Sequence, residues 1–276
     1  MANILVPFDF SANAAAALDQ AILLAKQAKR SIIVLHITNA EVIRDYPAGW
    51  NYPAHKTDTD FIRQKLDEAI AFRKKHCIGD EPLEISGLVK ESVMVNGGII
   101  NQMLLSKSEL IIMGTHGATN ALDRFWGSNT STMINHAIFP VLAIPRTWQP
   151  VLFKEVLAAI SLRETGRFMG NVLKWANWLQ ASPELVTISS IPEAEQDLAD
   201  SFRKDYPAVK LHLVLKKDDL PLWRNLVQFT ANYSQAVLLM FVHERTVLEK
   251  LFNYSITSRV ADGVHIPLLA LPTEHK

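Results

Sequence analysis

Short apolar runs alternate with longer amphipathic segments along the first half of the chain. The apolar runs are rich in valine, leucine and isoleucine, which is typical of strands buried on both faces. The segments between them are alanine-rich or carry apolar residues on one face, which predicts helices. The predicted strands are 4–8, 31–38, 83–90, 110–114 and 141–144, and the predicted helices are 11–29, 58–76, 97–106 and 128–136.

This alternation predicts an α/β fold with a doubly wound parallel sheet and helices on both of its faces. In such sheets ligands bind at the carboxyl ends of the strands, where the winding direction reverses. Asp9 and Gly114 each come at or just past the end of a predicted strand. We therefore expect them to line the same crevice.

The second half of the chain repeats the first. Shifted by 127 residues, the segment 113–145 aligns with 240–272 without a gap, and 11 of the 33 positions are identical. The first strands, 4–9 and 156–161, correspond at an offset of 152, so the second copy is shorter in its middle. A tandem duplication is indicated. It predicts two Rossmann-like domains of five strands each, 1–147 and 148–276, related by pseudo-two-fold symmetry.

Composition narrows the range of partners. The chain has 276 residues, enough for two domains that bury their own cores, and 28 Lys and Arg balance 28 Asp and Glu. Without an excess of positive charge, we expect neither nucleic acid nor membrane as a partner. The chain starts without a basic leader or an apolar signal stretch, which favours a cytoplasmic location. The single cysteine, Cys77, cannot form an internal disulfide.

Glycines and hydroxyl-bearing residues follow the strand 110–114. Gly114, Gly117 and Gly127 are succeeded by Ser, Asn and Thr at 128–130, where a helix is predicted to begin. Glycines let backbone N–H groups approach an anion closely, and a helix N-terminus attracts negative charge. The pattern therefore predicts a phosphate-binding site.

Two further strand ends complete a recognisable set of motifs. They are Pro7-Phe8-Asp9-Phe10-Ser11 and Leu35-His36-Ile37, upstream of Met113-Gly114-Thr115-His116-Gly117 and Gly127-Ser128-Asn129-Thr130. With these motifs the chain resembles the universal stress protein family, as a tandem member with the glycine motif of the ATP-binding branch. The resemblance implies an adenine nucleotide alpha hydrolase-like fold, a role in stress response or signalling, and ATP, ADP or AMP as ligand, with Mg²⁺ as a candidate companion.

The resemblance also implies roles for individual residues. Asp9 would contact the adenosine part of the ligand, the backbone at Ile37 the adenine edge, and Met113 the ribose. The glycines and the segment 128–130 would surround the phosphates. The predicted binding residues are Pro7, Asp9, Ile37, Met113, Gly114, His116, Gly117, Gly127, Ser128, Asn129 and Thr130.

The second copy has lost this motif. Phe241, Glu244 and Tyr254 stand where the first copy has its three glycines, and Ser161 stands where it has Asp9. These side chains occupy the space that an anion needs, and a carboxylate would repel a phosphate. We expect the second site to hold no nucleotide.

The sequence favours binding over turnover. It holds neither a Gly-x-x-x-x-Gly-Lys-Ser/Thr loop nor a Gly-x-Ser-x-Gly elbow. His116 has a counterpart, His243, in the copy that lost the glycines, which favours a structural role for this histidine. Two alternatives stay open: a slow ATPase, and a nucleotide-independent scaffold that binds another, unidentified protein.

The two halves are expected to associate within one chain. In the family that the chain resembles, the last strand pairs subunits edge to edge, and here the segments 141–144 and 268–271 are both available. Their pairing would make one chain a pseudo-dimer with two fewer exposed edges, and it leaves further dimerisation open. Trp175 and Trp178, one helical turn apart, are expected to pack in the core or between the domains.

Overall fold

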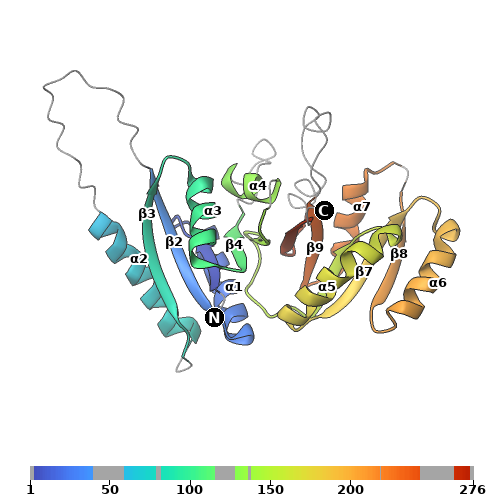
Figure 1. Cartoon of the computed structure of the whole chain (residues 1–276), viewed down its shortest axis with the longest axis horizontal. Helices are drawn as coiled ribbons and strands as arrows, with labels where there is room; N and C mark the ends of the chain where they lie inside the picture. Colours follow the sequence, from blue (N-terminus) through green and yellow to red (C-terminus); the bar gives the residue numbers. More distant parts are fainter. Residues whose placement is uncertain are drawn as a thin grey trace, which may run out of the picture.

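The computed structural model describes residues 3–39, 59–78, 82–115, 128–135, 138–217, 219–242 and 264–273. Their strands form one sheet in the order β3-β2-β1-β4-β5-β10-β9-β6-β7-β8 (Figure 1). The strands are β1 (Asn3–Pro7), β2 (Ser31–Asn39), β3 (Ile85–Ser92), β4 (Leu110–Gly114), β5 (Val141–Ile144), β6 (Glu155–Ala159), β7 (Ser182–Ser189), β8 (Lys210–Leu215), β9 (Ala236–Val242) and β10 (Leu268–Pro272). The helices are α1 (Ala12–Ala28), α2 (Thr59–Arg73), α3 (Val95–Ser106), α4 (Ser128–Asn135), α5 (Thr165–Leu179), α6 (Gln196–Asp205) and α7 (Leu222–Thr230).

The two halves of the sheet meet at its centre. β5 and β10 pair antiparallel, with Leu142 opposite Leu269, whereas neighbours within each half run parallel. The predicted pairing of the two last strands within one chain is therefore confirmed. The strand register is also the same in the two halves. Ile4 of β1 pairs with Leu110 of β4, and the corresponding residues of the second half, Val156 of β6 and Val237 of β9, pair in the same way.

α1 shows why the first helix forms and how closely it packs on the sheet. Ser11 caps it, because the Ser11 hydroxyl accepts a hydrogen bond from the backbone N–H of Ala14 at 3.1 Å. Half of the buried residues of the helix are alanine, namely Ala14, Ala17, Ala21 and Ala25. Side chains this small let the helix axis approach the strands, which brings its first turn close to the end of β4.

A buried glutamine connects the halves. Gln20 of α1 is fully buried, its amide nitrogen donates to the carbonyl of Val151 at 3.0 Å, and its amide oxygen accepts from the Trp148 indole at 2.9 Å and from the Val151 N–H at 3.1 Å. Nearby, the Trp178 indole of α5 donates to the Glu109 carboxylate at 3.0 Å. Trp178 therefore contacts the first half, and packing between the halves was one of the two places expected for it.

Some predicted bounds differ from the structure. The predicted helix 58–76 is α-helical only to Arg73 and continues as a π-helix, Lys74–Ile78. The third strand lies two residues further along than predicted, at Ile85–Ser92, and α3 begins at Val95 rather than at residue 97. Within the described segments, every helix is too short or too polar to cross a membrane.

Candidate functional site

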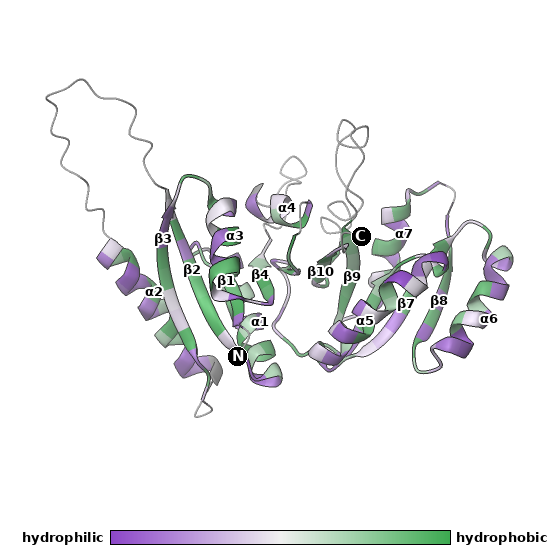
Figure 2. Ribbon diagram, in the orientation of Figure 1, coloured by the Kyte–Doolittle hydropathy of each residue, from purple (hydrophilic) through white to green (hydrophobic). Residues whose placement is uncertain are grey.

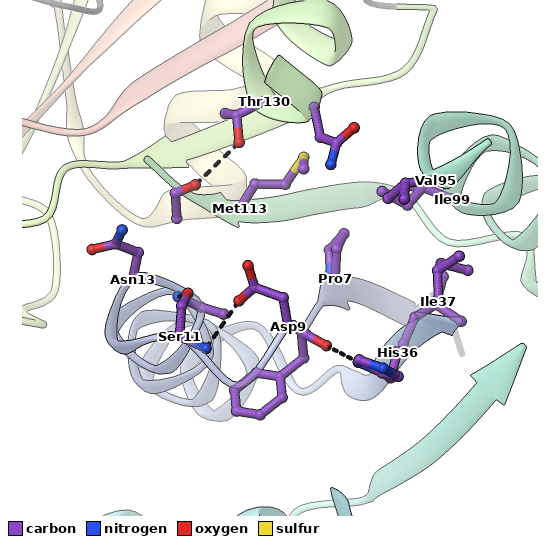
Figure 3. Close-up of a pocket in the computed structure, with 15 residues that line it drawn as sticks. Pro7, Asp9, Ser11, Asn13, His36, Ile37, Val95, Ile99, Met113 and Thr130 are labelled. Carbon is purple, nitrogen blue, oxygen red and sulfur yellow. Dashed lines mark hydrogen bonds between the residues drawn. The ribbon is translucent and has the colours of Figure 1, made fainter. Parts of the chain in front are cut away.

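A hollow of about 320 Å³ opens at the carboxyl ends of β1, β2 and β4, between the first turns of α1, α3 and α4 (Figure 3). This is the edge of the sheet where the sequence places Asp9 and Gly114. The lining residues are Pro7, Phe8, Asp9, Ser11, Asn13, Ala14, Leu35, His36, Ile37, Val95, Ile99, Met113, Gly114, Asn129 and Thr130.

One end of the hollow is apolar. Ile37 of β2 and Val95 and Ile99 of α3 gather there (Figure 3). α3 packs tightly on β2 at this point, because a Cβ on Gly98 would lie 2.8 Å from the Cδ1 of Ile37. A flat apolar group of a ligand at this end would be enclosed by aliphatic side chains. Small-molecule sites are commonly lined by such apolar side chains.

The other end is polar. Asp9 and Ser11 form a tight turn in which the Asp9 Oδ1 accepts a hydrogen bond from the Ser11 N–H at 3.0 Å. Phe10, between them, adopts a left-handed backbone with φ of 64°, which costs a non-glycine residue about 1–2 kcal/mol. The second carboxylate oxygen of Asp9 points across the hollow towards Met113 (Figure 3). It is therefore placed to accept a hydrogen bond from a ligand.

Gly114 joins three elements of the site. A Cβ at this position would lie 2.2 Å from the carbonyl oxygen of Asn13 and 2.4 Å from its carbonyl carbon, so the end of β4 and the first turn of α1 leave room only for glycine. The carbonyl of Gly114 also accepts a hydrogen bond from the Thr130 hydroxyl at 3.1 Å, which ties α4 to the same point. The close approach of the β4 and α1 backbones is therefore enough to require glycine at position 114, whether or not a ligand binds there.

His36 is a lining residue with a fixed orientation. Its Nδ1 lies 2.7 Å from the carbonyl oxygen of Phe8, and because a carbonyl only accepts, Nδ1 carries the proton. The His36 ring also packs on the Phe10 ring, with centroids 4.9 Å apart. These contacts hold the turn after β1 against the end of β2. His36 belongs to one of the sequence motifs, but the sequence predicts no role for it.

The structure brings together most of the predicted binding residues that it describes. Those lining the hollow are Pro7, Asp9, Ile37, Met113, Gly114, Asn129 and Thr130. Ser128 opens α4. The sequence did not predict Asn13, Ala14, Val95 and Ile99 as lining residues. Their only signal is their place in the first two turns of α1 and α3. The positions outside the described residues are His116, Gly117, Gly127, His243, Glu244 and Tyr254.

Comparison with known proteins identifies the family. The model of the universal stress protein family matches residues 1–145, which is more than half of the chain. The chain belongs to the universal stress protein family. The resemblance inferred from the sequence motifs is thereby confirmed.

Relatives of this universal stress protein include single-domain and tandem-length chains. Universal stress protein MJ0577 of Methanocaldococcus jannaschii is 29% identical over 157 residues, which cover 52% of this chain and 94% of the relative. The structure of a universal stress protein from Archaeoglobus fulgidus is 14% identical and has a TM-score of 0.72, and the match covers 98% of this chain and 96% of that chain. The structure of a putative universal stress protein from Pseudomonas aeruginosa is 17% identical and has a TM-score of 0.64, and the match covers 98% of this chain and 92% of that chain. These two structures show that the fold extends over both halves.

Two aromatic side chains, Phe241 and Phe168, lie at the corresponding place in the second half of this universal stress protein. Phe241 occupies the position in β9 that Gly114 occupies in β4, as the pairing with β10 and β5 shows. The Phe241 ring stacks on Phe168 of α5 with centroids 4.1 Å apart, and both rings are buried. Ser161, at the position of Asp9, caps a short 3-10 turn by accepting from the Arg163 N–H at 3.3 Å.

Proposed function

We propose that this universal stress protein binds one adenine nucleotide in the hollow of its first half, and that the second half supports the fold without a nucleotide of its own. The observation that carries the proposal is the contrast between the halves. The first keeps an open hollow beside Gly114, and the second has the Phe241–Phe168 ring pair at the equivalent place. Sheets of this kind bind ligands at this edge.

The shape of the hollow supports a definite orientation of the ligand. The adenine ring suits the apolar end formed by Ile37, Val95 and Ile99. A ribose hydroxyl suits the outward oxygen of Asp9, since an ionised carboxylate only accepts hydrogen bonds. The phosphates suit the N-terminus of α4, where Asn129 and Thr130 lie and where the helix dipole favours negative charge.

The volume agrees with this assignment. A hollow of about 320 Å³ lies at the lower end of the range for small-molecule sites, about 300–1,000 Å³. That space accommodates the nucleoside part, with the phosphates extending towards α4. We propose ATP as the ligand, with ADP and AMP as the competitors to be compared, and Mg²⁺ as a companion whose need is tested by chelation.

Binding rather than rapid hydrolysis is the proposed activity. Asp9 is the one carboxylate among the described residues that line the hollow, and its Oδ1 is already engaged by the Ser11 N–H. The role we propose for Asp9 is therefore to hold the ligand. The bound nucleotide would then act in stress response or signalling through a protein partner that senses the occupied state.

Thermal unfolding with added nucleotide tests the proposal. A ligand held only by the folded state stabilises it by about 2.7 kcal/mol at 100 times its Kd, which raises the melting temperature. Val95→Trp fills the apolar end and should remove this shift. Met94→Trp is the matched control, because Met94 is 68% exposed and does not line the hollow.

Asp9→Asn tests the polar end separately. The amide oxygen of asparagine can still accept from the Ser11 N–H, so the turn is retained while the charge is lost. We expect ATP affinity to fall about tenfold, the size of one charged hydrogen bond. An unchanged melting temperature with ATP, ADP and AMP, or an equal loss of the shift in Met94→Trp and Val95→Trp, would contradict the proposed site.

A further inference from the structure

The outer face of α2 carries two exposed aromatic rings. Phe61 is 50% exposed and Phe72 is 59% exposed, whereas Leu66 and Ile70, on the opposite face, are buried against the rest of the first half. α2 lies at the outer end of the sheet, beside the edge strand β3 (Figure 1). Two large exposed rings on one helix are a candidate contact surface.

These rings belong to a continuous stripe of four residues, Phe61, Lys65, Glu68 and Phe72, which we call the α2 stripe. Their spacing of four, three and four residues places them in one line along the helix. The Lys65 ammonium lies 4.4 Å from the centre of the Phe61 ring, and the Gln64 amide donates to Glu68 at 2.9 Å. Hydropathy colouring shows this mixture of apolar and charged positions along α2 (Figure 2).

The α2 stripe is complementary to itself when reversed. In an antiparallel pair of α2 helices, Phe61 of one copy faces Phe72 of the other, and Lys65 of one faces Glu68 of the other. The spacing is that of the core positions of an antiparallel coiled coil. In a parallel pair, Lys65 would face Lys65 and Glu68 would face Glu68, which is repulsive. We propose that two copies of this chain dimerise through their α2 stripes about a two-fold axis.

The geometry limits the assembly to a dimer. The counterpart of α2 in the second half is α6, which has 10 residues against 15 and carries one exposed large apolar side chain, Leu198. The α2 stripe therefore occurs once per chain, and a self-complementary surface that occurs once closes as a pair. A single helix pair buries less than the roughly 1,200 Å² at the lower end of stable interfaces, so the dimer is expected to be weak.

The two Lys65–Glu68 pairs at the centre would fix the register. Polar pairs in such a seam cost some stability but exclude other alignments. Because no described residue of α2 lines the nucleotide hollow, dimerisation through this face does not depend on the proposed nucleotide binding.

Sedimentation equilibrium over roughly 5–500 μM chain, a range suited to a micromolar Kd, tests the proposal. We expect the average mass to rise towards twice the chain mass with concentration. Phe61→Glu combined with Phe72→Glu should give a monomer throughout. Leu198→Glu, on α6, is the control and should leave the dimer intact, and circular dichroism checks that each variant is folded.

Charge exchange tests the register. Lys65→Glu alone and Glu68→Lys alone each place like charges opposite one another twice, and each should weaken dimerisation about tenfold or more. The double variant Lys65→Glu with Glu68→Lys restores opposite charges and should recover the original Kd within about threefold. A wild-type chain that stays monomeric, a dimer that survives the two phenylalanine substitutions, or a double exchange without recovery would each overturn the proposal.

Discussion

Gly114→Ala changes one hydrogen to a methyl group at the point where β4 meets α1. The added Cβ would lie 2.2 Å from the Asn13 carbonyl oxygen, and an ordinary contact needs at least 3.4 Å, so the two backbones must separate by more than an ångström. The obstacle is the backbone of a helix, which cannot rotate away as a flexible side chain can. Overpacking typically costs about 1–3 kcal/mol, and we expect the upper end of that range, about 3 kcal/mol.

Gly97→Ala is the matched control. Gly97 lies in α3. A Cβ added at Gly97 would lie 3.7 Å from the Cβ of Met94, its nearest neighbour, which is an ordinary contact. Alanine is a better helix former than glycine by about 0.5–1 kcal/mol, so this variant should be slightly more stable than the original chain. The same chemical change is thus expected to have opposite signs at the two positions.

Urea denaturation followed by circular dichroism measures both variants. The midpoint should fall for Gly114→Ala and rise for Gly97→Ala, with similar slopes. Displacing the first turn of α1 also moves Asn13 and Ser11 in the hollow, so Gly114→Ala should weaken ATP binding about tenfold or more. A Gly114→Ala midpoint equal to that of the original chain would show that β4 and the first turn of α1 do not approach each other this closely.

Three other substitutions test different parts of the molecule. Gln20→Ala removes the three hydrogen bonds that this buried side chain makes between the halves, and the free energy of unfolding measured in urea should fall by about 2–4 kcal/mol. Burial and the Glu184 carboxylate raise the pKa of Tyr233 from 10.0 to about 12. Between these two pH values the folded chain keeps the Tyr233 proton and the unfolded chain loses it, so the free energy of unfolding should fall as the pH rises from 10 to about 12. Tyr233→Phe removes this titration and should make the fall less steep. Phe241→Ala removes a ring buried against Phe168, and should cost about 3–5 kcal/mol in urea without creating a second ATP site in calorimetry.

Each of these expectations has a contrary result. A Gln20→Ala chain as stable as the original would mean that the Val151 segment is not held through this side chain. If the Tyr233→Phe chain loses stability in alkali as steeply as the original chain, Tyr233 is not the group responsible for that loss. A Phe241→Ala chain that binds two ATP would show that the ring alone closes the second site.

The strands and the repeat could be predicted because burial dictates them. Residues 110–114 and 141–144 are apolar runs buried on both sides, and their predicted and observed bounds coincide. The change from α-helix to π-helix after Arg73 could not be predicted, because both forms present similar side-chain patterns and differ in backbone hydrogen bonding. The start of α3 was missed because Met94, its N-cap, makes no capping hydrogen bond through its side chain.

The candidate site was predictable where it depends on backbone chemistry. Glycine spacing and strand ends pointed to Asp9 and Gly114, which the structure places in one hollow. The apolar end was not predicted, because Val95 and Ile99 reach the hollow only through the packing of α3 on β2, and nothing in their local sequence differs from an ordinary helix face. The clash that requires Gly114 likewise arises from Asn13, a hundred residues away in the chain.

Isothermal titration calorimetry with ATP, on protein first unfolded, freed of bound small molecules and refolded, measures how many nucleotides each chain binds. We expect a stoichiometry of one nucleotide per chain, bound in the hollow of the first half. A stoichiometry of two, or no heat with ATP, ADP or AMP, would contradict it.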